Sequence, residues 1–230
     1  MHNAGPIVVV SPHSDDGVLS VGAAMARWAR AGIRVELLTV FGLDPGSTTR
    51  TRGWDRRAGF STEGEAARAR REEDRRACAL LGATPRWLPF GSVDYDRHGD
   101  DDDVRRAVAD AVGDPDLVLL PGFPLSHPDH EWLVRRLVPD FESDTTLALY
   151  AEQPYTRRAG AAPEVPDWLA EATAAAAFEE MHTRLRDRVA KWRAIREYRS
   201  QLPLLGMRRS LRRGAHRSAF GPEWIARAPD

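Results

Sequence analysis

Near the start of the chain, a short apolar strand is followed by an amphipathic helix, and this combination restricts the possible folds. Residues 7–10 are four β-branched residues in a row, and such a run without polar alternation is typical of a parallel sheet covered on both faces. Apolar residues then recur at helical spacing over 18–29. With a second strand expected over 33–41, the first forty residues predict a βαβ unit.

The same alternation continues along the chain. Further strands are expected over 86–90, 117–120 and 147–150, and helices over 65–81, 103–112, 128–137, 168–176 and 178–199. The polar segment 45–64 is longer than most connections, which suggests a functional or mobile loop. This pattern predicts a three-layer α/β fold with a mostly parallel sheet.

Composition narrows the class of protein. A chain of 230 residues, 42% hydrophobic and 29% charged, suits one globular domain. The formal net charge of -1 argues against general nucleic-acid binding, which needs an excess of basic residues. The only cysteine, Cys78, excludes an intramolecular disulfide and a thiolate zinc cluster. The N-terminal segment lacks a basic region, and its apolar run is too short for a signal peptide or membrane span, so we expect a cytoplasmic protein.

Two clusters of metal-binding residue types follow strands of the predicted sheet. After the first strand come His13, Asp15 and Asp16, and after the strand ending at residue 120 come His127 and His130. The carboxyl ends of parallel strands meet at one edge of the sheet, where ligands bind. We therefore expect the two clusters to meet, although more than a hundred residues separate them.

The residue types in these clusters fit a catalytic zinc site. Such a site needs three nitrogen or oxygen ligands and an open position for water, and His13, Asp16 and His130 would supply the ligands. Zinc lowers the pKa of a bound water molecule toward about 7, and Asp15 could accept its proton as general base. His127 could stabilise the oxyanion or protonate the leaving group. At a helix N-terminus the dipole disfavours imidazolium, which favours the hydrogen-bonding role.

Each cluster alone also has a simpler interpretation. The first could be a loop in which Asp16 caps the following helix, and residues 127–130 could be an ordinary helix start. The occurrence of both clusters at matching strand ends favours a site.

These segments resemble the LmbE-like, or PIG-L, family of zinc-dependent de-N-acetylases. The family has a strand followed by a His-Pro-Asp-Asp-Glu-like segment, matched by residues 11–17, and a later His-x-x-His segment, matched by 127–130. The resemblance spans roughly residues 6–202. Further matches are Arg70 to Asp74 before Leu81-Gly82, the acidic segment Tyr150 to Tyr155, and Lys191, Tyr198, Ser200 and Gln201.

The resemblance implies a Rossmann-like fold in a single deacetylase domain, 1–230, with a core over about 6–202 and an Arg-rich tail over 203–230. It implies one zinc ion per chain, or another divalent metal, held by His13, Asp16 and His130. Asp15 would then be the general base, and His127 would assist the tetrahedral intermediate. The family's usual reaction removes the acetyl group from an amino sugar, commonly N-acetylglucosamine within a larger conjugate.

The chain departs from the family pattern at two positions beside the expected ligands. Ser14 replaces the common proline and Gly17 replaces the common glutamate. These changes leave the expected metal and base positions intact but remove one contact beside the site. Arg70 and Asp94 are the candidate substrate contacts, although Arg70 could instead pair with Glu73 on a helix surface.

Several other residues allow more than one interpretation. Trp54 and Phe60 in the long loop could stack on a sugar, close the cleft or simply pack. Lys191 is the only lysine among 33 basic residues, and a structural ion pair would explain its retention. Arginines of the tail suit phosphates, but in an Arg-biased chain solvent exposure is the simpler explanation. These are Arg208, Arg209, Arg212, Arg213 and Arg217.

The leading prediction is a hydrolase that releases acetate and a free amine from an N-acetylglucosamine-type conjugate or related small metabolite. An amidase acting on a longer acyl group or a cysteine-conjugate amide would use the same metal site. A sugar-binding protein without turnover could keep the same fold. A nucleotide-dependent enzyme is disfavoured, because the first strand-to-helix turn lacks Gly-x-Gly-x-x-Gly and carries acidic residues. No oligomeric state follows from the sequence.

Overall fold

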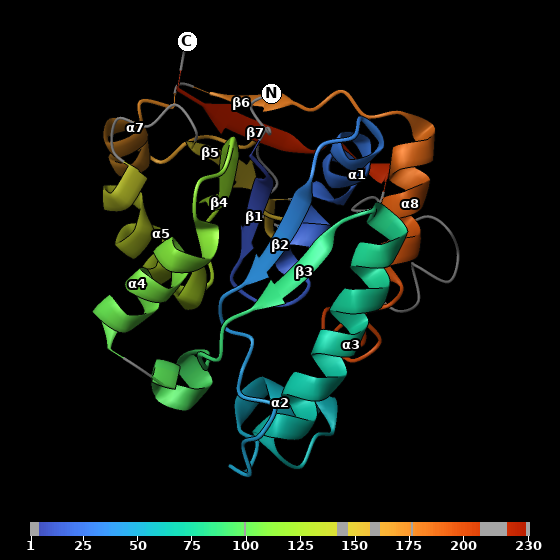
Figure 1. Ribbon diagram of the computed structural model, residues 1–230, viewed down its shortest axis with the longest axis vertical. Coiled ribbons are helices and arrows are strands. Elements are labelled where there is room, and N and C mark those ends of the chain that lie inside the picture. Colours follow the sequence, from blue (N-terminus) through green and yellow to red (C-terminus); the bar gives the residue numbers. More distant parts are fainter. Residues whose placement is uncertain are drawn as a thin grey trace.

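The computed structural model describes residues 5–98, 100–141, 147–156, 162–175, 177–207 and 220–228. Its centre is a seven-stranded sheet of order β3-β2-β1-β4-β5-β7-β6 (Figure 1). The strands are β1 Ile7–Ser11, β2 Val35–Thr39, β3 Thr84–Trp87, β4 Leu117–Phe123, β5 Leu147–Ala151, β6 Phe178–Glu180 and β7 Trp224–Arg227. The first five pair in parallel, and β7 pairs antiparallel with both β5 and β6. The predicted mostly parallel α/β sheet is thus confirmed.

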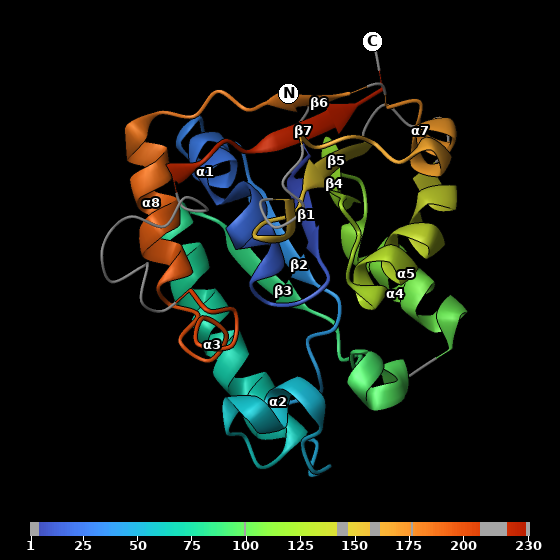
Figure 2. The same ribbon diagram turned by 180° about the vertical axis from the view of Figure 1, so that it is seen from behind.

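Helices cover both faces of the sheet. They are α1 Asp16–Arg30, α2 Gly53–Ala58, α3 Glu63–Leu81, α4 Asp101–Val112, α5 Pro128–Leu137, α7 Asp167–Thr173 and α8 Leu185–Ile195, with 3-10 helices η1 Val93–His98 and η2 Val138–Phe141. Figures 1 and 2 show α1, α3 and α8 on one side and α4, α5 and α7 on the other. The three-layer arrangement is therefore the predicted one.

The continuous apolar strands explain this layering. Along β1, Val9 packs into the core beneath α1 and α3, whereas Val8 and Val10 pack into the core beneath α4 and α5. Successive side chains of a strand point to opposite faces, so a strand covered on both faces must be apolar throughout. Val8, Val9 and Val10 are fully buried.

Four expectations about elements need correction. The segment 45–64 contains α2, and the third strand covers Thr84–Trp87 rather than 86–90. The helix expected from residue 178 begins only at Leu185, because residues 178–180 form β6. Pairing with β7 overrides the local helical preference there.

The expected tail over 203–230 also differs from the structure. Residues 224–227 are not outside the sheet but form β7, between β5 and β6. The sheet therefore extends past the expected core boundary near residue 202. The five tail arginines between 208 and 217 lie outside the described residues. In the part of the chain that the structure describes, no helix has both the length and the apolar character needed to cross a membrane.

Candidate active site

The loop after β1 is held in shape by Ser11, the last residue of that strand. Its hydroxyl donates to the carbonyl of His13 and accepts a hydrogen bond of 2.9 Å from the backbone N–H of Gly17. A Cβ added at Gly17 would lie 2.6 Å from the Leu37 side chain. The absence of a side chain at residue 17 therefore lets α1 begin directly against β2.

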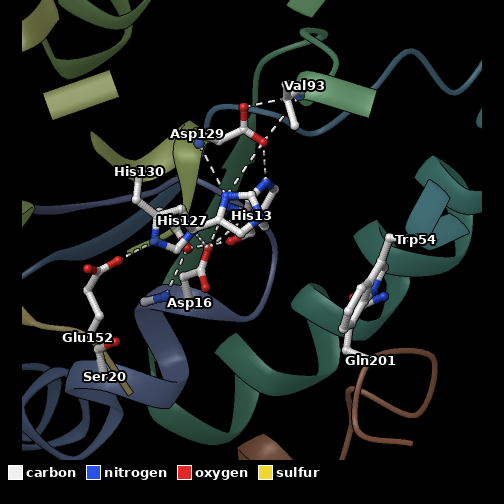
Figure 3. Close-up of polar contacts among 12 residues, drawn as sticks. His13, Asp16, Ser20, Trp54, Val93, His127, Asp129, His130, Glu152 and Gln201 are labelled. Atoms are coloured by element: carbon white, nitrogen blue, oxygen red, sulfur yellow. Dashed lines mark hydrogen bonds and ion pairs between the residues drawn. The ribbon is translucent and has the colours of Figure 1, made fainter. Parts of the chain in front are cut away.

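His13, Asp16 and His130 meet at the carboxyl edge of the sheet, as Figure 3 shows. Oδ2 of Asp16 lies 3.1 Å from Nδ1 of His13 and 3.1 Å from Nε2 of His130. The two ring nitrogens lie 3.2 Å apart. Tetrahedral ligands about 2.0–2.1 Å from zinc would lie roughly 3.3–3.4 Å apart. The three atoms therefore form a triangle slightly smaller than the one expected around a bound zinc ion.

Each of the two histidines has a carboxylate on its other ring nitrogen. Nε2 of His13 lies 3.2 Å from Oδ2 of Asp129, and Nδ1 of His130 hydrogen bonds to Glu152. Asp129 also accepts the backbone N–H of Val93 at 3.0 Å, and Glu152 accepts that of Leu125 at 2.8 Å. Metal-binding histidines commonly have such carboxylate partners, which fix the ring orientation. Sequence reasoning missed both Asp129 and Glu152 as site residues.

The electrostatics of this cluster favour a cation. Burial opposes charge on Asp16, but the charges and hydrogen bonds of His130 and His13 hold its pKa well below its usual range. Burial would likewise lower the pKa of His13, yet its hydrogen bonds to Asp129 and Asp16 raise that pKa to about 9. The surrounding carboxylates thus stabilise positive charge at the centre.

The first cluster does not behave as a simple helix cap. Asp15 is the N-cap residue of α1 and makes no side-chain capping hydrogen bond. Asp16 is already helical, and its carboxylate accepts the backbone N–H of His13 at 2.9 Å. The interpretation of Asp16 as a capping residue is therefore wrong.

Asp15 is buried and lines the cavity beside the three predicted ligands. Burial, followed by the neighbouring charge of Asp16, raises the pKa of Asp15 to about 7. A carboxylate with such a pKa can exchange a proton near neutral pH. A bound cation would lower this pKa again.

His127 is the N-cap residue of α5, and its Nδ1 accepts the backbone N–H of Asp129 at 3.2 Å. The proton of the neutral ring is therefore on Nε2. Burial, together with the charges of His13 and His130, lowers the pKa of His127 to about 4. His127 is thus suited to donate a hydrogen bond as a neutral imidazole. Ring nitrogens of the three histidines lie within 4.8 Å of one another, so His127 also belongs to a group that could hold a metal ion.

A cavity of about 330 Å³ opens beside these groups. Arg70 and Asp94, the candidate substrate contacts, both line it. Arg70 forms an ion pair with Asp55, rather than with Glu73, and Asp94 accepts the backbone N–H of Trp54 at 3.0 Å. The cavity therefore joins the predicted ligands and base to side chains from α2, α3 and η1.

The fold and site define an α/β protein with a histidine and carboxylate centre, suited to a metal ion, at the carboxyl edge of its parallel sheet. Residues 8–140, more than half of the chain, match the model of the PIG-L family, described as GlcNAc-PI de-N-acetylase. The chain belongs to this family, and it is a hydrolase of the de-N-acetylase type. A search of curated proteins found no match.

Solved structures share the fold over nearly the whole chain. The deacetylase Dbv21, which acts on the A40926 pseudoaglycone, is 26% identical with a TM-score of 0.77, covering 98% of this chain and 97% of that chain. The zinc-inhibited form of teicoplanin deacetylase Orf2 is 24% identical with a TM-score of 0.74, covering 98% and 99%. GalB, a 4-carboxy-2-hydroxymuconate hydratase from Pseudomonas putida KT2440, is 22% identical with a TM-score of 0.60, covering 98% and 97%. Because a hydratase shares the fold, the reaction is assigned from the family and not from the fold.

Proposed function

We propose that this hydrolase removes the acetyl group from an N-acetylglucosamine-type sugar within a larger conjugate, releasing acetate and a free amine. The observation that carries the proposal is the triangle of His13, Asp16 and His130 atoms, 3.1 to 3.2 Å apart, beside a substrate-sized cavity. The family match and the likeness to Dbv21 support an amino-sugar substrate. A cytoplasmic location stays a prediction from the sequence.

His13, Asp16 and His130 would hold the metal, which we propose to be zinc. The donor set of two imidazoles and one carboxylate suits zinc and leaves a position for water. When bound, zinc lowers the pKa of water and polarises the amide carbonyl. The carboxylate partners Asp129 and Glu152 keep both imidazoles oriented toward the centre.

The remaining steps belong to side chains that line the cavity. Asp15 takes a proton from the attacking water and then gives it to the departing amine, which balances the hydrolysis. His127 donates from Nε2 to the oxygen on which negative charge develops. A neutral His127 can make this hydrogen bond without losing a proton to the product.

Acetate release from N-acetylglucosamine conjugates, measured with and without a chelator, tests the proposal. We expect chelation to abolish turnover and stoichiometric metal to restore it. Zinc, cobalt and manganese should be compared from below one equivalent upward, because a structural relative exists in a zinc-inhibited form. Activity that survives complete metal removal would contradict the mechanism.

Metal content of purified variants tests the ligands independently of activity. H13A and H130A should lose most of their metal, whereas H182A should keep it, because His182 is exposed and does not line the active-site cavity. Full metal retention in both ligand variants would exclude this centre. A panel of acetyl, longer acyl and cysteine amides separates deacetylation from the alternative amidase reaction.

A further inference from the structure

The six-residue helix α2 is fixed at the cavity by both N–H groups of Trp54. Its backbone N–H donates to Oδ2 of Asp94 at 3.0 Å, and its indole Nε1 donates to Oε1 of Gln201 at 2.7 Å. Figure 3 shows Trp54 and Gln201 together, apart from the histidines. All three residues line the cavity. The tryptophan is therefore held between two segments that are distant in sequence.

A second anchor lies one residue further along α2. Asp55, only 3% exposed, forms an ion pair with Arg70 of α3. Its other carboxylate oxygen accepts the hydroxyl of Tyr95 at 2.8 Å. These buried contacts fix α2 against α3 and η1. The wall that carries Trp54 is thus attached to the scaffold on several sides.

The Gln201 side of the contact is equally fixed. Glu73 of α3 accepts the backbone N–H of Ser200 at 2.8 Å and its hydroxyl at 2.7 Å. The hydroxyl of Tyr198 donates to Asp74 at 2.9 Å. In turn, Gln201 donates from Nε2 to the oxygen of Ser200 at 2.7 Å. The acidic pair of α3 therefore sets the position of the glutamine that holds Trp54.

The contacts that hold Trp54 are more numerous than the packing of a surface loop requires. The side chain of Trp54 is half-buried and faces a cavity, and the guanidinium of Arg57 lies 5.2 Å from its ring centroid. Aromatic side chains bind rings through large, geometrically specific contact areas. Fixing such a side chain in advance reduces the entropy lost on binding. Trp54 and the residues that hold it therefore form a preformed binding surface.

We infer that Trp54, held by Gln201 and Asp94, is a specificity-determining residue that forms an outer subsite for the ring attached to the amino sugar. The inference rests on the proposed function, because the metal-centre end of the cavity must hold the acetamide. The occupant is an apolar or aromatic ring of the conjugate, in contact with the indole. The sugar itself remains with the residues near the metal centre.

The test compares methyl and aryl glycosides of N-acetylglucosamine, with kcat/KM measured by acetate release. The aryl-to-methyl preference ratio cancels any loss of folded enzyme, because both substrates meet the same protein. We expect about a tenfold preference for the aryl glycoside in the wild type, expressed mainly in KM, since one aromatic contact contributes about that much. W54A should reduce the ratio to near one, and W54F should restore part of it.

Trp168 provides the matched control. It also lies beneath an arginine, with Arg135 4.0 Å from its ring centroid, but it is on α7 and does not line the cavity. W168A should leave the ratio unchanged. A ratio unaltered in W54A, or absent from the wild type, overturns the outer subsite. Failure of the wild type to release acetate from either glycoside overturns the proposed function instead.

Discussion

Gly53 shows how a single residue determines the geometry of the cavity. Its φ of +40° lies in the left-handed region, and an added Cβ would collide with the carboxylate of Asp94. We predict that G53A loses more stability than left-handed strain alone explains, because Asp94 must also move away from Trp54. The expected loss is about 2–4 kcal/mol in the free energy of unfolding, with a raised KM for conjugates.

Gly59 is the control for Gly53, because an alanine there would cause backbone strain without a steric collision. Its φ is +93°, yet a Cβ there would meet no atom within 4 Å. G59A should therefore cost only the conformational strain, about 1–2 kcal/mol, and leave KM unchanged. Urea unfolding and steady-state kinetics of the two variants measure the difference. Equal losses would mean that the Asp94 contact contributes nothing.

At this scale, some residues could be predicted and others could not. His13 and His130 were expected to meet because each follows a strand of one parallel sheet at its carboxyl edge. Asp129 could not be assigned to His13, because a pairing between two side chains depends on rotamers that no sequence spacing encodes. Glu152 did carry a usable signal, since it directly follows β5 at the same edge of the sheet.

Helix α1 is interrupted in the middle. Val21 has non-helical angles, φ −127° and ψ 22°. The carboxylate of Glu223 accepts the N–H groups of Ala23 and Ala24 at 2.8 and 2.7 Å. Lys191 donates to the same carboxylate at 2.6 Å and to the carbonyl of Ser20 at 3.3 Å. This buried ion pair provides hydrogen-bond partners for backbone groups at the interruption. It also gives a structural reason for a lysine at residue 191, the only lysine of the chain.

We predict that K191M destabilises the protein by about 3–5 kcal/mol, because it leaves the Glu223 carboxylate buried without its cation. K191M/E223Q should recover part of that loss, since the amide carries no charge. R193M, at an exposed position of the same helix, is the control and should be nearly neutral. Urea unfolding measures all three. A double variant no more stable than K191M would show that the charge is not what matters.

Asp74 links α3 to β3 and to the segment after α8. Its carboxylate accepts Nε1 of Trp87 at 2.6 Å and the hydroxyl of Tyr198 at 2.9 Å. Burial raises the pKa of this carboxyl from 3.8 to about 8. Between these values the folded protein keeps a proton that the unfolded chain has lost, so this contribution to stability decreases as pH rises.

The matching experiment compares the unfolding free energies of wild type and D74N from pH 5 to pH 9. The asparagine does not titrate, so we expect the stability of the wild type relative to D74N to decrease as pH rises toward 8. Chemical denaturation at each pH gives the difference directly. Parallel curves for the two proteins would show that Asp74 does not titrate in this range.

The two strands that the sequence failed to predict share one property. β1, β2, β4 and β5 are apolar segments whose local pattern already indicates a strand. β6 and β7 have only 3 and 4 residues and pair antiparallel with each other across more than forty positions of sequence. Their strand conformation comes from this long-range pairing, which local propensity cannot report.

The strand β7 joins the sheet to the helical layer that contains α1 and α8. β7 lies between β5 and β6, and Ile225 and Ala226 are buried. Glu223, just before β7, accepts hydrogen bonds from α1 and from Lys191 of α8. β7 therefore links β6 to the rest of the sheet, and Glu223 accepts hydrogen bonds from α1 and α8, two helices on one face of that sheet.

We predict that a chain ending at residue 207 is much less stable than the full chain. It loses the partner of β5 and β6 and leaves Lys191 buried without its carboxylate. Each kcal/mol of lost stability lowers the unfolding midpoint by about 2–4 °C in a protein of this size. A loss of several kcal/mol should therefore lower the midpoint of thermal unfolding by roughly 10 °C or more. A chain ending at residue 228 retains β7 and serves as the control, expected within about 2 °C of the full chain. Metal content measured on both proteins shows whether removal of β7 also disrupts the metal centre at the carboxyl edge of the sheet. An unchanged unfolding midpoint in the shorter chain would mean that β7 does not belong to the cooperative unit.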